Sequence, residues 1–318
     1  IVDLSTELPY EEFVLMNNAN IKFVSVSGDV LVSGEYVGGV FGYLGENSST
    51  YDISFEVKYD DSENRQQIYS TYCAGGIVGV NYGSINHAKV RHSDEGQTKI
   101  DNAIKTYLKT GVTGNFGKTN LFNGKLWYVG GVVGINYGGI VTNSYTRVDI
   151  VDPNISGDLD EVTEQYFGGL VGVTYGGEIS SAYASGNIVT KASETEENDN
   201  YYAGGLIGRV NYLAGRVIKD QDNKTNPYVI TLRTLYALNY WDYSTAKTTF
   251  RTDGINYHAG TYVGYVSPIE DSKITTDVGA LYSINQIKFN GKNLFSGSNG
   301  VTGEVALRMV GKNDANLL

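Results

Sequence analysis

A tract of the form Gly-Gly-x-x-Gly, set inside an apolar run, recurs along this chain. A sixth, degenerate copy runs from Gly260 to Gly264 and keeps only the outer glycines. Self-similarity of this kind is the signature of stacked copies of one supersecondary unit. The architecture can therefore be inferred before any chemistry. The intact glycine pairs are Gly38 and Gly39, Gly75 and Gly76, Gly130 and Gly131, Gly168 and Gly169, and Gly204 and Gly205.

The tracts favour β-strands over helices. The run 128–135 is apolar on both strand faces, as in a strand that is buried on both sides. Three glycines in a helix would each cost about 0.5–1 kcal/mol relative to alanine, whereas glycine in a strand marks a bend or a close approach of backbones. The segment 136–139, Asn-Tyr-Gly-Gly, supplies a turn. Each unit is therefore predicted to be strand, tight turn, strand.

The spacing of the glycine pairs predicts an all-β solenoid, or β-helix. From Gly38 the intervals are 37, 55, 38, 36 and 56 residues, which are multiples of about 18–19, within the range of solenoid repeats. We predict coils of about 18–19 residues, with the glycine-rich face returning every second or third coil. Two loop insertions of similar size would produce the same spacing, so this alternative stays open.

The boundaries follow from the extent of the repeats. Residues 1–27 are expected to form an N-terminal cap or first coil, in which a short helix could begin near Ser5. Residues 28–266 carry the repeats, and residues 267–318 are degenerate C-terminal coils or a cap. Polar stretches at 60–67, 153–164 and 191–200 look like loops that leave the rod.

Composition excludes several classes of function. The formal charge of −11 and the lack of a basic cluster argue against nucleic-acid binding. The single cysteine, Cys73, precludes an intrachain disulfide and a cysteine-based zinc site, and it is expected to be a packed thiol. No apolar stretch approaches the roughly 18 residues of a membrane span.

No catalytic motif stands out. The three histidines are predicted to be surface or packed residues, because none is arranged as in a zinc peptidase. Paired carboxylates in a β-helix groove could cleave polysaccharides, but a solvated surface is the simpler interpretation of the candidate acids. We expect no cofactor, although two acidic clusters could hold Ca²⁺ through oxygen ligands. These residues are His87, His92 and His258; Asp149, Asp152, Glu178 and Asp242; and Asp158, Asp160 and Glu161 with Asp220 and Asp222.

An aromatic residue precedes most of the glycine pairs. Tyr36, Tyr128, Tyr166 and Tyr202 stand two residues before a pair and would share one face if the pairs superpose. They could form a packed ladder that covers the glycine-rich surface. They could instead form an exposed platform that binds a glycan or a protein, because tyrosine has a large rigid face and a polar tip.

Several copies resemble the GLUG motif. The tract 167–172, followed by the segments 175–179 and 181–189, is similar to the family pattern GGLVG-x-N-x-G-x-I-x-NSYATG-x-V. The copy that begins at Gly130 matches as well. The resemblance implies a stalk or interaction module, because such repeats occur in bacterial cell-surface and secreted proteins, including adhesins and the non-catalytic regions of IgA1-specific metallopeptidases.

We therefore expect a non-enzymatic structural or adhesive segment of a bacterial protein that is extracellular or on the cell surface. Its partner would be a host or neighbouring-cell protein or glycan, or identical subunits. The alternatives are a carbohydrate-active β-helix enzyme, either a lyase or a hydrolase, and a non-catalytic module of a secreted metallopeptidase.

Overall fold

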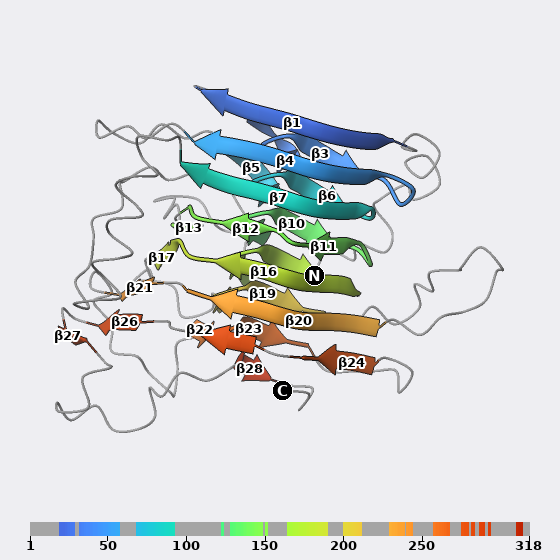
Figure 1. The fold of residues 1–318 in the computed structure, drawn as a ribbon. Helices are drawn as coiled ribbons and strands as arrows, with labels where there is room; N and C mark the ends of the chain where they lie inside the picture. The colour runs from blue at the N-terminus through green and yellow to red at the C-terminus, as the bar shows by residue number, and fades with distance from the viewer. Residues whose placement is uncertain are drawn as a thin grey trace.

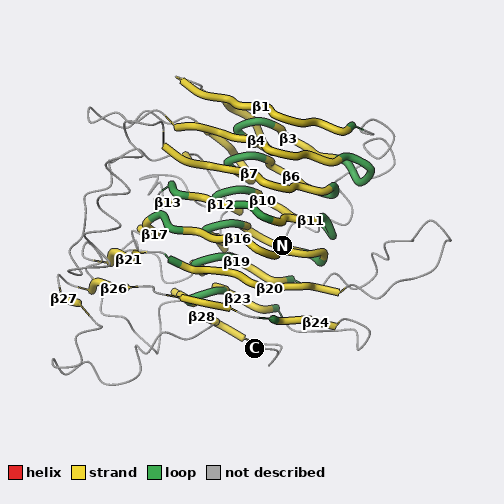
Figure 2. Tube along the Cα trace, viewed as in Figure 1, coloured by secondary structure: helices red, strands yellow, loops and turns green. Residues whose placement is uncertain are grey.

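The computed structural model contains strands and turns, with no helix in the residues it describes (Figure 2). The strands form four stacked sheets, designated A to D, in which every pairing but one is parallel. The described residues are 19–28, 32–57, 68–92, 122–123, 128–148, 150–151, 164–189, 200–211, 229–238, 240–243, 257–267, 275–279, 281–283, 286–289, 292–293 and 310–313.

Sheet A is the broadest and forms the front of the molecule in Figure 1. It contains β1 (Asn20–Gly28), β4 (Ser49–Val57), β7 (Ser84–His92), β11 (Ile140–Thr142), β12 (Tyr145–Thr146), β16 (Gly177–Ala184), β20 (Val229–Ala237), β24 (Thr275–Val278) and β25 (Leu281–Ser283).

Sheets B and C carry the glycine tracts. Sheet B contains β2 (Val32–Gly38), β5 (Ile68–Gly75), β8 (Phe122–Asn123), β9 (Tyr128–Gly130), β14 (Glu164–Gly168), β18 (Asn200–Gly204) and β22 (Tyr257–Gly260). Sheet C contains β3 (Phe41–Leu44), β6 (Val78–Asn81), β10 (Val133–Asn136), β15 (Val171–Thr174), β19 (Ile207–Val210), β23 (Val263–Val266) and β28 (Val310–Asn313). Sheet D contains β13 (Ile150–Val151), β17 (Asn187–Val189), β21 (Tyr240–Tyr243), β26 (Gln286–Phe289) and β27 (Lys292–Asn293), and the β26–β27 pair is antiparallel.

The chain passes from sheet B to C to A, and in the later coils on to D, before it returns to B one level further along, so the solenoid-like, all-β prediction is confirmed. The predicted coil of 18–19 residues is wrong. Gly38 pairs in register with Gly75, which pairs with Gly130, so successive tracts lie on adjacent coils. The register continues through Gly168 and Gly204 to Gly260. Each interval is therefore one coil, and its variable length reflects the connections between strands.

With fewer coils, the stack of glycine tracts is shorter than the sequence predicts. Twelve coils of 18–19 residues would have made a rod of roughly 58 Å at about 4.8 Å per coil. The five intervals between six stacked tracts span about 24 Å at the same spacing. In Figure 1, the strands of sheet A accordingly follow one another in chain order from β1 to β24.

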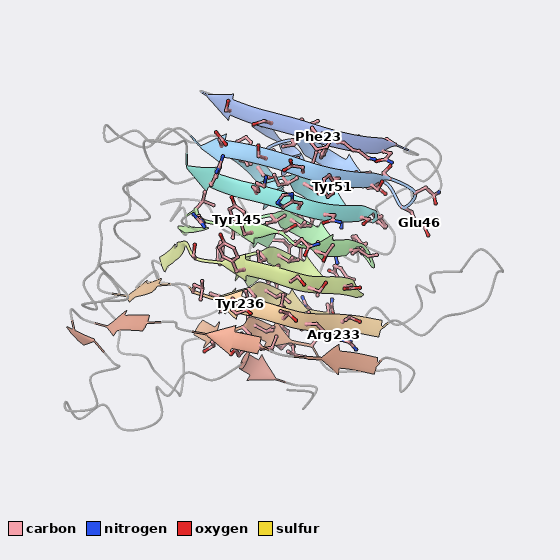
Figure 3. The ribbon with its side chains drawn as sticks, in the orientation of Figure 1. Phe23, Glu46, Tyr51, Tyr145, Arg233 and Tyr236 are labelled. Carbon is pink, nitrogen blue, oxygen red and sulfur yellow. The ribbon has the colours of Figure 1, made fainter. Side chains whose placement is uncertain are left out.

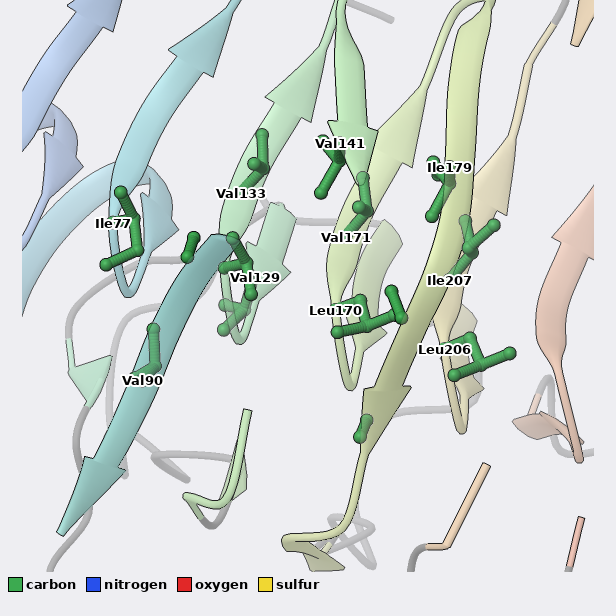
Figure 4. Packing of buried hydrophobic residues seen from close by; sticks show 14 of the residues in the cluster. Ile77, Val90, Val129, Val133, Val141, Leu170, Val171, Ile179, Leu206 and Ile207 are labelled. Carbon is green, nitrogen blue, oxygen red and sulfur yellow. The ribbon is translucent and has the colours of Figure 1, made fainter. Parts of the chain in front are cut away.

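Two buried clusters fill the interior. The aliphatic cluster joins sheet A to sheets B and C, and Figure 4 shows Val141 and Ile179 of sheet A beside Val133 and Val171 of sheet C. The aromatic cluster collects the tyrosines of sheets B and C together with Cys73. Alternation of side chains along each strand of sheet A directs one set inward and leaves the other on the outer face.

The expectations for the two terminal segments and the polar stretches can be compared with the described residues. The capping helix near Ser5 and the central parts of the three polar stretches lie outside the described residues. β1 is the first strand of sheet A and pairs with β4. Beyond residue 266, β24, β25, β26 and β28 continue sheets A, D and C.

Candidate functional site

The glycines of the tract are required by close backbone contact. A Cβ on Gly130 would stand 2.6 Å from the backbone nitrogen of Gly172 on the next coil. A Cβ on Gly131 would stand 2.1 Å from the carbonyl oxygen of Gly169 and 2.7 Å from Oγ1 of Thr146 in sheet A. Side chains do not approach this closely, so the tract closes the bend between sheets B and C and seats it against sheet A. Its glycines are structural.

The four tyrosines before the glycine pairs do lie in one column of sheet B. Tyr128 is in register with Tyr166, and Tyr166 with Tyr202. Their rings stack with centroids 5.5 and 4.8 Å apart, and their exposed fractions are 6%, 1% and 2%. Tyr36, at the end of the column, is half-buried. This burial fits the packed ladder, because an exposed platform needs ring faces that the three central residues do not present to solvent.

Cys73 occupies the tyrosine position of its coil, in register with Tyr36 and Tyr128. The ring of the preceding residue, Tyr72, fills the resulting space and contacts the rings of both tyrosines, at centroid distances of 5.3 and 5.7 Å. Burial raises the pKa of the Cys73 thiol far above its ordinary value. Cys73 is therefore a packed thiol with little thiolate character.

The outer face of sheet A carries a second aromatic column that the sequence analysis did not select. Tyr145 is in register with Lys89 on one side and with Tyr183 on the other, and Tyr183 is in register with Tyr236. The rings of Tyr145 and Tyr183 are nearly parallel, 4.9 Å apart at an angle of 4°. Tyr236 is 40% exposed, and Figure 3 shows Tyr145 and Tyr236 on this face.

Arg147 contacts two tyrosines of this outer column. Arg147 donates a hydrogen bond from Nε to the hydroxyl of Tyr183, at 2.8 Å. Its guanidinium carbon lies 5.2 Å from the ring centroid of Tyr145 and 5.6 Å from that of Tyr183, within the range of a cation–π interaction. We call Lys89, Tyr145, Tyr183, Tyr236 and Arg147 the outer tyrosine column. A sequence signal for it existed, because Tyr145 and Tyr183 each follow the first glycine of their tract by 15 residues.

A bulge repeated in six coils shapes the same face. In each of these coils, one residue of sheet A has a positive φ, and the pairing with the adjacent strand skips this residue. The inward–outward alternation of side chains is interrupted there, so that two consecutive residues point outward. Positive φ is uncommon outside glycine, asparagine and aspartate. Its recurrence at one level shows that the fold imposes it. These residues are Phe23, Asp52, His87, Asn143, Ser181 and Thr234.

At the N-terminal end, the outer face displays an aromatic and charged group. Phe23 is 72% exposed and contacts Tyr51 edge to face at 5.9 Å, and Tyr51 contacts the ring of His87 at 5.8 Å. Lys89 Nζ lies 2.6 Å from Oδ1 of Asp52. This hydrogen bond lowers the pKa of the Asp52 carboxyl below its ordinary value, and the positive charge of Lys89 acts in the same direction.

Among the remaining candidate acids and histidines, only Glu178 and His87 have described side chains, and each has a different partner. Glu178 accepts a hydrogen bond of 2.6 Å from Ser180 on its own strand, and His87 lies 3.4 Å from Asp52. Asp149, Asp152 and both proposed Ca²⁺ clusters lie outside the described residues, and only the backbones of His92, Asp242 and His258 are described. The part of the chain that the structure describes has no group of three or more metal-ligating side chains. It also lacks a helix that is long and apolar enough to cross a membrane.

A comparison with known protein families identifies the same repeat. Residues 126–151 and 163–189 match the GLUG motif. The chain contains GLUG repeats. Each match corresponds to one coil: the first covers β9 to β13, and the second covers β14 to β17. A GLUG repeat is thus one turn through sheets B, C, A and D, and its tyrosine in sheet A belongs to the outer tyrosine column. No curated protein and no solved structure matches the chain.

Proposed function

We propose that this GLUG-repeat chain is a non-enzymatic display segment of a bacterial surface or secreted protein, and that it binds a macromolecular partner through the outer face of sheet A. The observation that carries the proposal is the outer tyrosine column. It holds aromatic side chains on the outside of the fold, whereas the described tyrosines of sheets B and C pack together in a buried cluster.

The scaffold is suited to holding such a face rigid. Backbone hydrogen bonds connect successive levels of sheets B and C, and the glycines bring the backbones of adjacent coils into close contact. Coils that contact only their neighbours create extended surfaces from repeated small elements. Side chains on regular strands are also positioned more precisely than side chains on loops.

The location of the protein is part of the proposal. The resemblance to repeats of adhesins and of secreted peptidases supports an extracellular or cell-surface segment. A glycan or protein of a host or neighbouring cell, or another copy of the chain, would then be within reach of sheet A.

A binding screen with a turnover readout tests this function. The purified chain is passed over immobilised neutral and acidic polysaccharides, extracellular-matrix proteins and immobilised copies of itself, while reducing ends and unsaturated products are measured in solution. We expect retention on at least one surface, with loss of retention in Tyr183→Ala. Glu46→Gln, at an exposed turn outside sheet A, should bind as the wild type does. Retention that Tyr183→Ala leaves unchanged, absence of retention on every surface, or polysaccharide turnover would each overturn the proposal.

A further inference from the structure

The outer face of sheet A differs in charge from the chain as a whole. The complete sequence carries a net charge of −11. Among the side chains described on the outer face, five are basic and three are acidic, which gives a net charge of +2. The basic residues are Lys22, Lys89, Arg91, Arg147 and Arg233, and the acidic residues are Asp52, Glu56 and Glu178. A partner attracted to this face, and not to the rest of the molecule, is therefore expected to be acidic.

Two of the three acids of this face, Asp52 and Glu56, lie near its N-terminal end on β4, and Glu178 lies on β16. Lys89 pairs with Asp52 at 2.6 Å, and Arg91 pairs with Glu56 at 2.6 Å. Further along the solenoid, Arg147 bonds to the Tyr183 hydroxyl and lies within cation–π distance of the Tyr145 and Tyr183 rings. A guanidinium whose orientation is fixed in this way is well suited to carboxylate or sulfate oxygens, because it loses little freedom when they bind.

The chemistry around Arg147 favours a sugar over an apolar protein segment. The neighbouring outward positions carry hydroxyls and amides, such as Asn86, Thr142, Asn143 and Ser180, and Asn143 donates a hydrogen bond of 3.1 Å to Asn86. Tyr145 and Tyr183 present ring edges and hydroxyls, because their faces stack on each other. A protein hot spot would need an apolar pocket for an anchoring side chain, whereas this flat face offers polar groups that repeat about every 4.8 Å from coil to coil.

We propose that the outer tyrosine column binds an acidic polysaccharide, which lies across the strands from β7 to β20 with a carboxylate or sulfate group at Arg147. The sugar hydroxyls would bond to the tyrosine hydroxyls and the adjacent amides. This inference rests on the proposed function, and it specifies the class of partner for the same face.

The binding of defined polymers tests the proposed preference for an acidic polysaccharide. Heparin represents sulfated chains, polygalacturonate represents carboxylated chains, dextran is the neutral control, and polyglutamate is an acidic polymer without sugar. Affinity is measured by titration calorimetry at two salt concentrations. We expect heparin or polygalacturonate to bind, and Arg147→Gln to weaken that binding by about tenfold, as loss of a charge-assisted hydrogen bond implies. Lys22→Gln removes the same charge from β1 on the same face, and it should change the affinity by less than about twofold.

A second substitution separates the role of Arg147 in binding from one in folding. Tyr183→Phe keeps the ring and removes the hydroxyl that accepts the Arg147 bond, so it should weaken acidic-polysaccharide binding while the urea midpoint stays close to that of the wild type. Equal binding of dextran, equal or tighter binding of polyglutamate, or equal losses from Lys22→Gln and Arg147→Gln would overturn the inference. Tyr183-dependent binding of a neutral glycan or a protein instead would also overturn it, while leaving the proposed display function standing.

Discussion

The amide of Asn81 donates a hydrogen bond of 2.8 Å to Oδ1 of Asn136, 55 residues further along the chain and one coil away. Asn136 in turn lies 3.1 Å from the carbonyl oxygen of Gly139 and 3.2 Å from Oγ1 of Thr174 on the following coil. Both asparagines are fully buried. The turn after sheet C is therefore joined from coil to coil by a polar ladder in which each buried group has a partner.

Breaking this ladder should be costly. Asn136→Val would leave the Asn81 amide buried without this acceptor, whereas the carbonyl oxygen of Gly139 would keep the backbone N–H of Glu178. We expect a loss of about 1–3 kcal/mol in the free energy of unfolding, measured by urea denaturation. Asn86→Ala is the matched control, because Asn86 accepts its amide bond on the exposed face and lies outside the positive-φ positions. A loss in the control as large as in Asn136→Val would show that burial of the ladder is not the cause.

The third glycine of each tract offers a comparison within one column. A Cβ on Gly172 would stand 2.5 Å from the carbonyl oxygen of Gly134 and 2.8 Å from the nitrogen of Val129, both backbone atoms. Gly42 occupies the same position in the first tract, where the nearest atom to a Cβ would be Tyr36 O at 3.2 Å. Gly172→Ala should therefore destabilise the protein by about 3 kcal/mol, through overpacking.

Gly42→Ala provides the control for this prediction. It should change the free energy of unfolding by less than about 1 kcal/mol. Alanine restricts the unfolded chain more than glycine does, which is slightly stabilising and offsets the mild contact of the new Cβ with Tyr36 O. Urea midpoints of the two variants, measured side by side, test the pair. Similar midpoints would contradict the assignment of the glycine requirement to contact between coils.

A buried hydroxyl in sheet A points to a stabilising change. Oγ1 of Thr146 has no hydrogen-bond partner, and the neighbouring residues in its column are Val90 and Ala184. Thr146→Val keeps the shape and removes an unsatisfied polar group, so it should raise the free energy of unfolding by about 1 kcal/mol. Thr142→Val is the counterpart, because Oγ1 of Thr142 is hydrogen-bonded to Oγ of Ser180 on the outer side. Thermal unfolding should show a higher midpoint for Thr146→Val alone.

The sequence determines more of the fold than of the candidate site. The strand character, the stacking of coils and the structural role of the glycines followed from the Gly-Gly-x-x-Gly tracts. The coil length did not, because intervals of 37 and 55 residues could represent either different numbers of coils or one coil with connections of different length. Only the pairing of Gly75 with Gly130 distinguishes the two.

The aromatic rows show a similar limit. Tyr166 and Tyr183 are equally apparent in the sequence, but Tyr166 packs inside and Tyr183 lies on the outer face. The outward position of Tyr183 depends on the bulge in sheet A, where Ser181 has a φ of 50° and shifts the alternation by one residue. No residue type requires this conformation, since aspartate, histidine, serine and threonine all adopt it in neighbouring coils.

The ion pair between Lys89 and Asp52 predicts a defined pH dependence. A carboxyl whose pKa is lowered in the folded state adds stability at pH values above its unfolded pKa, near 3.8, and this stability is lost as the pH falls through the folded value. Lys89→Met should raise the pKa of Asp52, observed by NMR titration of the carboxyl carbon. It should lower the urea midpoint at pH 7, and the difference from the wild type should shrink as the pH falls below the ordinary carboxyl range. Arg91→Met removes a cation that pairs with Glu56 instead, so it should leave the titration of Asp52 nearly unchanged. An unshifted Asp52 in Lys89→Met would show that the hydrogen bond of 2.6 Å is not maintained in solution.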